Sequence, residues 1–187
     1  DHEGNPVTID EDTNGDGFRE TKSTFLAGIL QSTKVDRNKD GTPDILVTYL
    51  SGEPVKTEQD DDFDGKFENL FTTLKDGTQK QTLDSDRDGI IDTWLLVDKD
   101  MRPLKREEDH NNDGNLDLII EYSNGKAATL KQNTRLDDCF DVFQTFNDLE
   151  QIHFQKEDRN GDCDLDFWSG FKNGLPTFQA EDALGVG

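Results

Sequence analysis

The nine residues Asp84-Ser-Asp-Arg-Asp-Gly-Ile-Ile-Asp92 carry the pattern on which the whole chain is built. Carboxylates stand at positions one, three, five and nine of this segment, and a glycine stands at position six. A short segment can surround a calcium ion when alternate side chains supply oxygen atoms and a glycine lets the backbone turn. The segment therefore predicts a calcium-binding loop.

Related segments recur along the chain at a nearly constant interval. The other well-matched copies begin at Asp12, Asp36, Asp60, Asp109 and Asp158. With the copy at Asp84 included, the intervals between starts are 24, 24, 24, 25 and 49 residues, and 49 is the sum of 24 and 25. A degenerate copy is therefore expected near Asn133. The sequence predicts a single repeat array over residues 1–187, with a partial repeat at 1–11 and repeats starting near 12, 36, 60, 84, 109, 133 and 158.

Positions one, three, five and nine of the six well-matched copies supply the predicted metal ligands. They hold Asp, Asn or Glu, whose oxygen atoms suit calcium, whereas loops with so many carboxylates suit the small octahedral shell of magnesium poorly. We expect about six Ca²⁺ ions, one for each of these copies. The predicted ligands are Asp12, Asn14, Asp16, Glu20, Asp36, Asn38, Asp40, Asp44, Asp60, Asp62, Asp64, Glu68, Asp84, Asp86, Asp88, Asp92, Asp109, Asn111, Asp113, Asp117, Asp158, Asn160, Asp162 and Asp166.

Each copy leads into a β-hairpin. The segments 44–50, 92–97, 117–122 and 166–171 are rich in β-branched and aromatic residues and are predicted to be strands, as are 6–9, 54–58, 105–107 and 152–155. Tight turns are predicted at Ala27-Gly28, Ser51-Gly52, Asp76-Gly77, Asn124-Gly125 and Asn173-Gly174. No segment shows a helical period with capping residues, so no sizeable helix is expected.

These elements define an all-β fold of tandem β-hairpin repeats of about 24 residues, with a calcium loop between successive hairpins. Apolar residues such as Ile45, Val47 and Tyr49 alternate along one face of each leading strand. We expect a curved antiparallel meander, or solenoid-like sheet, that bends or folds over to cover this face. The alternative is a small four-bladed β-propeller, since two repeats would supply the four strands of a blade.

The charge of the chain limits its partners. Hydrophobic residues make up 30% of the chain and charged residues 33%, which is little apolar material for an ordinary core. Six calcium ions, carrying twelve positive charges, would change the net charge from −22 to −10. Nucleic acid and anionic lipid are poor partners for such an acidic surface, and no apolar run is long enough to span a membrane.

The sixth copy departs most from the pattern. Arg135 places a cation where a ligand is expected, so we predict that this copy binds no calcium. Cys139 and Cys163 lie 24 residues apart, at similar places in neighbouring repeats, and a disulfide between them would replace the missing ionic link. Two free buried thiols are the alternative. Cys163 also takes the glycine position of the last copy, where the turn is expected to be strained or altered.

The loop resembles the Asp-x-Asp/Asn-x-Asp-Gly calcium repeats of extracellular proteins, namely thrombospondin type 3 repeats, the FG-GAP blades of integrin-like propellers and related bacterial surface repeats. The resemblance covers nearly the whole chain but concerns the loop alone. Regularly spaced cysteines are missing, and a hairpin separates successive loops. The resemblance implies structural calcium and an extracellular location, and it supplies no catalytic residues that could be assigned to this chain.

We therefore predict a calcium-binding structural, adhesive or interaction module of a secreted or cell-surface protein, which includes the bacterial outer surface and periplasm. Its expected partner is an unidentified protein or glycan. We predict that it is not an enzyme, because His2, His110 and His153 are scattered and His110 is expected to face water. The alternative is a carbohydrate-binding or carbohydrate-active propeller domain. A start at Asp1, with Met101 as the only methionine, predicts a processed product or an excised segment.

Overall fold

The computed structural model describes residues 4–182, which divide into two compact units. The first unit ends at Ile91 and the second begins at Asp92. Within the described residues, β-strands are the only regular elements, and a helix long and apolar enough to cross a membrane is not found. The predicted all-β class is confirmed.

The strands follow the predicted alternation of hairpins and loops. The first unit contains β1 (Thr8–Glu11), β2 (Thr21–Leu26), β3 (Ile29–Val35), β4 (Ile45–Leu50), β5 (Glu53–Gln59), β6 (Asn69–Thr73) and β7 (Gln79–Leu83). The second contains β8 (Thr93–Val97), β9 (Pro103–Glu108), β10 (Leu118–Ser123), β11 (Lys126–Gln132), β12 (Val142–Phe146), β13 (Ile152–Glu157), β14 (Phe167–Lys172) and β15 (Leu175–Glu181).

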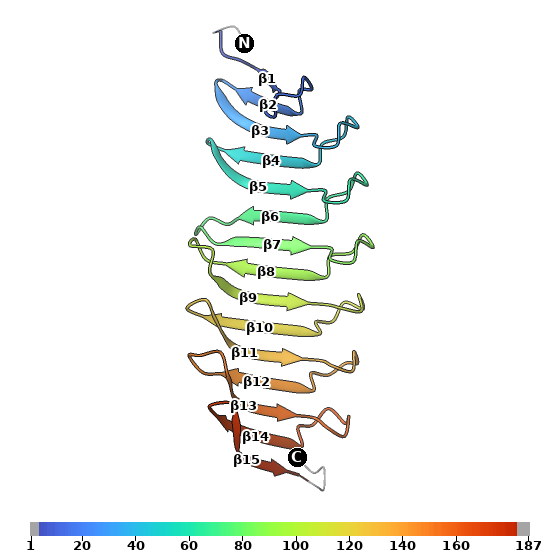
Figure 1. Ribbon diagram of the computed structural model, residues 1–187, viewed down its shortest axis with the longest axis vertical. Helices are drawn as coiled ribbons and strands as arrows, with labels where there is room; N and C mark the ends of the chain where they lie inside the picture. Colours follow the sequence, from blue (N-terminus) through green and yellow to red (C-terminus); the bar gives the residue numbers. More distant parts are fainter. Residues whose placement is uncertain (1–3, 183–187) are drawn as a thin grey trace. The chain divides into compact units, whose positions relative to one another are not determined.

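In each unit the strands pair antiparallel with their neighbours in the sequence, so that each unit is an open meander. Within each unit the hairpin turns lie along one side of the sheet and the acidic loops along the opposite side (Figure 1). A propeller would break its sheet after every four strands. Because β1–β7 pair continuously, as do β8–β15, the propeller alternative is wrong.

The turns adopt two geometries. At Ala27-Gly28 both residues have positive φ, 51° and 77°, as a type I′ turn requires. Ser51-Gly52, Asn124-Gly125 and Asn173-Gly174 repeat this geometry. The turn at Asp76-Gly77 differs from the prediction, since only Gly77 has positive φ and Leu74 N–H donates to Thr78 O across a longer turn (2.8 Å). This hairpin has a three-residue connection in place of the tight one.

Neither unit has the apolar core that its leading strands suggested. Val97 and Phe167 are the only buried hydrophobic residues among those described. Side chains of the predicted apolar face, such as Ile45 and Val47, are half-buried, because they pack only against neighbours in one sheet. The expectation that the sheet folds over this face is wrong within each unit. Most of the buried side chains are loop acids.

Candidate metal centres

The seven loops cover residues 12–20, 36–44, 60–68, 84–92, 109–117, 133–141 and 158–166, and are numbered here one to seven. Each connects two strands, and the loops within a unit lie on the side of its sheet opposite the hairpin turns (Figure 1). Loop four runs from the first unit into the second. Backbone hydrogen bonds bring the ends of a loop together, as where Asp44 N–H donates to Val35 O (2.8 Å) and Asp117 N–H donates to Glu108 O (2.7 Å). Position nine is thereby held beside the start of its own loop.

A second backbone hydrogen bond links successive loops. The N–H of position one donates to the carbonyl of position nine in the preceding loop, as in Asp36 to Glu20 and Asp60 to Asp44, both 2.8 Å. The same bond joins Asp84 to Glu68, Asp109 to Asp92, Asn133 to Asp117, Asp158 to Asp141 and Asp182 to Asp166. Asp182 was missed by sequence reasoning. The sequence could have indicated this residue, because Asp182 follows Asp158 by 24 residues, which is one repeat interval.

The carboxylate at position one orders the loop around itself. In loop three, Asp60 accepts hydrogen bonds from Phe63 N–H (2.7 Å) and Gly65 N–H (2.8 Å). Both donors have positive φ, 67° at Phe63 and 89° at Gly65. The glycine at position six is needed for this left-handed backbone, and its N–H contacts the position-one carboxylate in loops one to five.

Positions three and five each accept an N–H from two residues further along. Asp62 accepts from Asp64 N–H (3.2 Å), and Asp64 accepts from Lys66 N–H (2.8 Å). The backbone N–H of position seven is the main cause that lowers the pKa of Asp40, Asp64 and Asp113, while desolvation acts in the opposite direction. These exposed carboxylates therefore stay ionised, which is the form that binds a cation.

Position nine is the buried acid of every loop. Its carboxylate accepts the N–H of position two, as where Asp61 N–H donates to Glu68 Oε2 (2.9 Å). The acids at this position are all buried: Glu20, Asp44, Glu68, Asp92, Asp117, Asp141 and Asp166. Position one is also buried from loop three onward, whereas positions three and five lie at the surface or near it.

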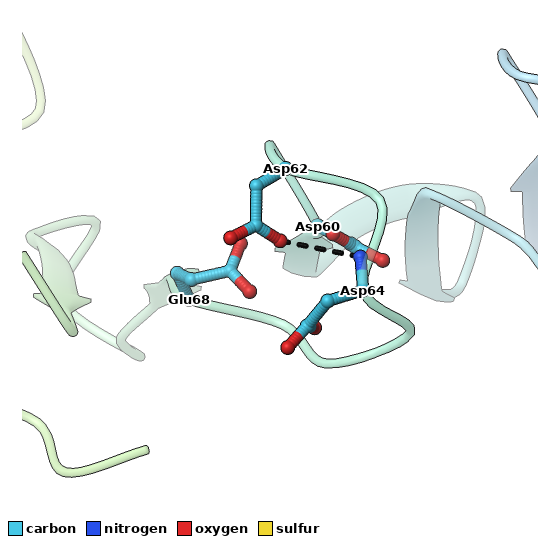
Figure 2. A group of neighbouring side chains, drawn as sticks. All are labelled: Asp60, Asp62, Asp64 and Glu68. Atoms are coloured by element: carbon cyan, nitrogen blue, oxygen red, sulfur yellow. Dashed lines mark hydrogen bonds between the residues drawn. The ribbon is translucent and has the colours of Figure 1, made fainter. Parts of the chain in front are cut away.

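Two loops gather their carboxylates closely enough to hold a metal ion. Asp60, Asp62, Asp64 and Glu68 each offer an oxygen within 4.8 Å of the others. Figure 2 shows these four side chains inside the turn of the chain, with Asp64 N–H donating to Asp62. Asp84, Asp86 and Asp88 form a second group of the same kind. Asp92, the fourth predicted ligand of that loop, belongs to the second unit.

Two further loops contain buried carboxylate oxygens without a hydrogen-bond donor. Glu20 Oε2 in loop one and Asp109 Oδ1 in loop five have no partner in the described chain, although these residues are only 8% and 5% exposed. A buried anionic oxygen is costly unless a donor or a cation neutralises it. The donor set of the loops therefore fits a bound cation.

Lysine and arginine side chains already bridge neighbouring loops. Lys39 at position four of loop two lies 2.6 Å from Asp16 Oδ2 in loop one, and Arg87 in loop four lies 3.6 Å from Asp62 in loop three. The hydrogen bond from Lys39 is the main cause that lowers the pKa of Asp16. Both pairs are partly exposed, so their contribution to stability is small.

Loops six and seven are joined covalently. Cys139 and Cys163 form a disulfide with their Cα atoms 5.7 Å apart, which confirms the predicted link. Cys163 has φ of 75° and donates its N–H to Asp158 (3.0 Å), so it adopts the left-handed conformation of the glycine that it replaces. This backbone is unfavourable for a residue with a side chain.

His110 makes a contact that the sequence did not predict. Its Nε2 atom lies 2.7 Å from Glu108 Oε2, and Glu108 is buried and also pairs with Arg106. The side chain is exposed, as predicted, and contacts this carboxylate at the same time. Glu108 was missed because it precedes position one of loop five, where the repeat pattern specifies no acid.

Comparison with known proteins finds no matching family model, no similar curated protein and no similar solved structure.

Proposed function

We propose that this chain is a β-hairpin repeat module of a secreted or cell-surface protein, in which the acidic loops bind calcium ions that stabilise the fold. The observation that carries the proposal is the burial of a carboxylate at position nine of every loop, in units that bury almost no apolar side chains. Buried acids are stable only when hydrogen bonds or cations compensate their charge.

Calcium fits the loops better than other common cations. The available donors are carboxylate and amide oxygens, which hard cations prefer, and each loop is dense in carboxylates. Magnesium binds few carboxylates and retains several waters, so a loop of this composition suits it poorly. Six occupied loops would also remove more than half of the net charge of −22.

An extracellular location agrees with both the disulfide and the proposed ion. Disulfides persist in oxidising compartments. Calcium modules of extracellular proteins bind with dissociation constants of roughly 10⁻⁴ to 10⁻³ M, which are sufficient at extracellular calcium concentrations. The role that we propose for the ions is structural and not catalytic, and a cell-surface protein or glycan is the proposed partner.

Calorimetric titration of the chelator-treated protein with CaCl₂ tests this function, with Asp64→Ala and Asp76→Ala as a matched pair. Both aspartates are exposed and both accept an N–H from two residues ahead, but Asp64 lies in a loop and Asp76 in a hairpin turn. The Asp64→Ala variant should lose one calcium ion, and Asp76→Ala should keep the wild-type number. An absence of calcium uptake by the wild-type protein would contradict the proposal.

A second candidate function is carbohydrate binding, and a hollow on the second unit favours it. The hollow has a volume of about 360 Å³ and is lined by Phe143, Phe154, Lys131 and Lys156 among others. The strand register places Phe143 directly opposite both lysines, on the same face of the sheet. An aromatic ring between two cationic groups can stack on a sugar that carries a carboxylate.

A glycan array screened with and without EDTA tests this second candidate. The Phe143→Ala variant should lose binding to any uronate-containing glycan that the wild-type protein retains, while Phe25→Ala, on β2 of the first unit, should bind normally. Equal binding by both variants, or no binding by the wild-type protein, would remove carbohydrate binding from consideration.

A further inference from the structure

Arg135 stands at position three of loop six, where the other loops have Asp or Asn. Its guanidinium contacts loop seven as well as the last residue of its own loop. Nη2 donates to the backbone carbonyl of Asp158 (2.6 Å), and Nη1 lies 3.3 Å from Asp158 Oδ2. Nη1 also lies 3.5 Å from Asp141 Oδ2. One cation thus lies between position nine of loop six and position one of loop seven.

Both carboxylates that face this guanidinium are almost fully buried. The side chains of Asp141 and Asp158 are 3% and 1% exposed, and that of Arg135 is 33% exposed. A guanidinium that is in contact with two buried anions neutralises charge where water cannot. Arg135 is therefore placed to compensate the two acids that a metal ion would otherwise compensate.

Arg37 bridges two loops without pairing with a carboxylate that is a predicted metal ligand. It donates from Nη2 to the backbone carbonyl of Asp60 (2.7 Å), the equivalent of the contact made by Arg135. Its ion pair, however, is with the exposed carboxylate of Asp61 at 3.6 Å, which is not a predicted ligand. Asp60 and Asp158 each accept two N–H groups from their own loops, so the difference lies in the ion pair, which involves the position-one carboxylate only for Arg135. Loop three keeps its group of four acids.

The interior of loop six is also occupied by its own donors. Asn133 at position one donates from Nδ2 to Asp117 Oδ1 (3.2 Å) and to the Asp137 carbonyl. Loop six is the only one of the seven in the described chain without positive φ at position six, which is Asp138. Asn133 Oδ1 accepts Asp137 N–H as a position-one carboxylate does, but its second polar atom is a donor nitrogen in place of a second oxygen.

We propose that Arg135 is a tethered cation that replaces calcium across loops six and seven, so that neither loop binds a calcium ion. The guanidinium and the Cys139–Cys163 disulfide hold this pair of loops without metal. The inference rests on the proposed function of loops one to five, and it changes the expected number of ions from six to five. It also makes the segment 133–166 independent of calcium.

The first test uses the unmodified, disulfide-bonded protein. Amide hydrogen exchange is measured in CaCl₂ and in EDTA. Exchange in 36–44 and 60–68 should accelerate at least tenfold on chelation, whereas exchange in 133–141 and 158–166 should stay within about twofold. Equal acceleration in all four segments would overturn the role of Arg135, because loops six and seven would then depend on calcium as the others do.

The second test counts calcium ions by native mass spectrometry in the wild-type protein, Arg135→Asn and Arg102→Asn. Asn is the natural residue at position three of four other loops, and Arg102 is a matched control that pairs with Asp98 and Asp100 in a hairpin turn. The wild-type protein and Arg102→Asn should bind five ions, and Arg135→Asn at least six, because Asp158 then loses its cationic partner and keeps only the N–H donors of its own loop.

The outcomes separate this inference from the function on which it rests. A wild-type protein that binds six ions, or an Arg135→Asn variant that still binds five, overturns the role of Arg135 and leaves calcium binding intact. A wild-type protein that binds none overturns both. Intact mass without reductant confirms that the disulfide is present in each variant.

Discussion

The ring of Phe178 on β15 lies across the backbone of Gly170 on β14, its partner in the strand register. A Cβ atom placed on Gly170 would lie 2.3 Å from Cε1 of Phe178, which is closer than a real contact. Gly170 is buried although it has no side chain, because the aromatic ring covers it. The pair therefore joins the last strand of the second unit to its neighbour.

Substitution of Gly170 should destabilise the protein only while Phe178 is present. We expect Gly170→Ala to lower the free energy of unfolding by about 1 kcal/mol, because the ring, which is 50% exposed, must move outward. In a Phe178→Ala background the same substitution should be nearly neutral. Urea denaturation of the four proteins of this double-mutant cycle measures the coupling, and additive effects would show that the two residues do not interact.

Positions five and nine of a loop should respond differently to calcium. Asp44 is buried and accepts N–H groups from Arg37 and Asn38, so Asp44→Ala should lower the free energy of unfolding by about 1–3 kcal/mol even in EDTA. Asp40 is exposed, and Asp40→Ala should have little effect in EDTA but should weaken calcium binding. Urea unfolding in both conditions distinguishes them. Similar losses in EDTA would argue against a structural role specific to position nine.

Removal of the disulfide should destabilise the protein whether or not calcium is present. The link joins residues 24 apart, and closure of a loop of that length contributes roughly 3 kcal/mol. A Cys139→Ser, Cys163→Ser double variant should therefore unfold at a lower temperature than the wild-type protein in CaCl₂ and in EDTA alike. Differential scanning calorimetry in both buffers measures the unfolding temperatures of the two proteins. A loss confined to EDTA would mean that calcium can replace the disulfide between loops six and seven.

Asp98 provides a pH-dependent contribution away from the loops. The N–H of Arg102 is the main cause that lowers the pKa of Asp98, with further help from Asp100 N–H and the Arg102 side chain. Because the pKa is lowered in the folded state, ionised Asp98 stabilises the fold above the ordinary aspartate pKa of about 3.9. This stabilisation is lost as the pH falls through the lower, folded-state pKa.

The matching experiment compares urea unfolding of the wild-type protein and Asp98→Asn in EDTA at about pH 6 and about pH 2.5. The wild-type protein should be the more stable at the higher pH, and the difference should shrink at the lower pH, which lies below the ordinary aspartate pKa and closer to the lowered pKa of Asp98. A difference that is equal at both pH values would assign the effect to side-chain shape and not to charge.

Much of the local structure could be predicted because it depends on neighbouring residues. The hairpin at Asn124-Gly125 follows from the tolerance of both residues for positive φ, and the spacing of Asp60, Asp62 and Asp64 follows from their bonds to nearby N–H groups. The turn at Asp76-Gly77 was predicted too short, because one Asp-Gly pair suits both two-residue and three-residue connections.

Burial could not be predicted in the same way. Ile45 and Val47 alternate as a core-facing strand does, yet they remain half-buried because a single sheet provides no second layer. The contact of Arg135 with Asp158 joins residues 23 positions apart, and its side chain could equally have faced water. Pattern alone does not specify which neighbour a long, flexible side chain reaches.

The sequence by itself determined the repeat interval, the order of strands and loops, and the oxygen-rich composition of each loop, because these follow from residue types at fixed spacings. Only the tertiary structure decided which acids are buried. The bond from Asp60 N–H to Asp44 O, repeated from loop to loop within each unit, brings position nine of one loop against position one of the next. That stacking excludes water from the carboxylates, and it depends on residues that are neighbours only after the hairpins have folded.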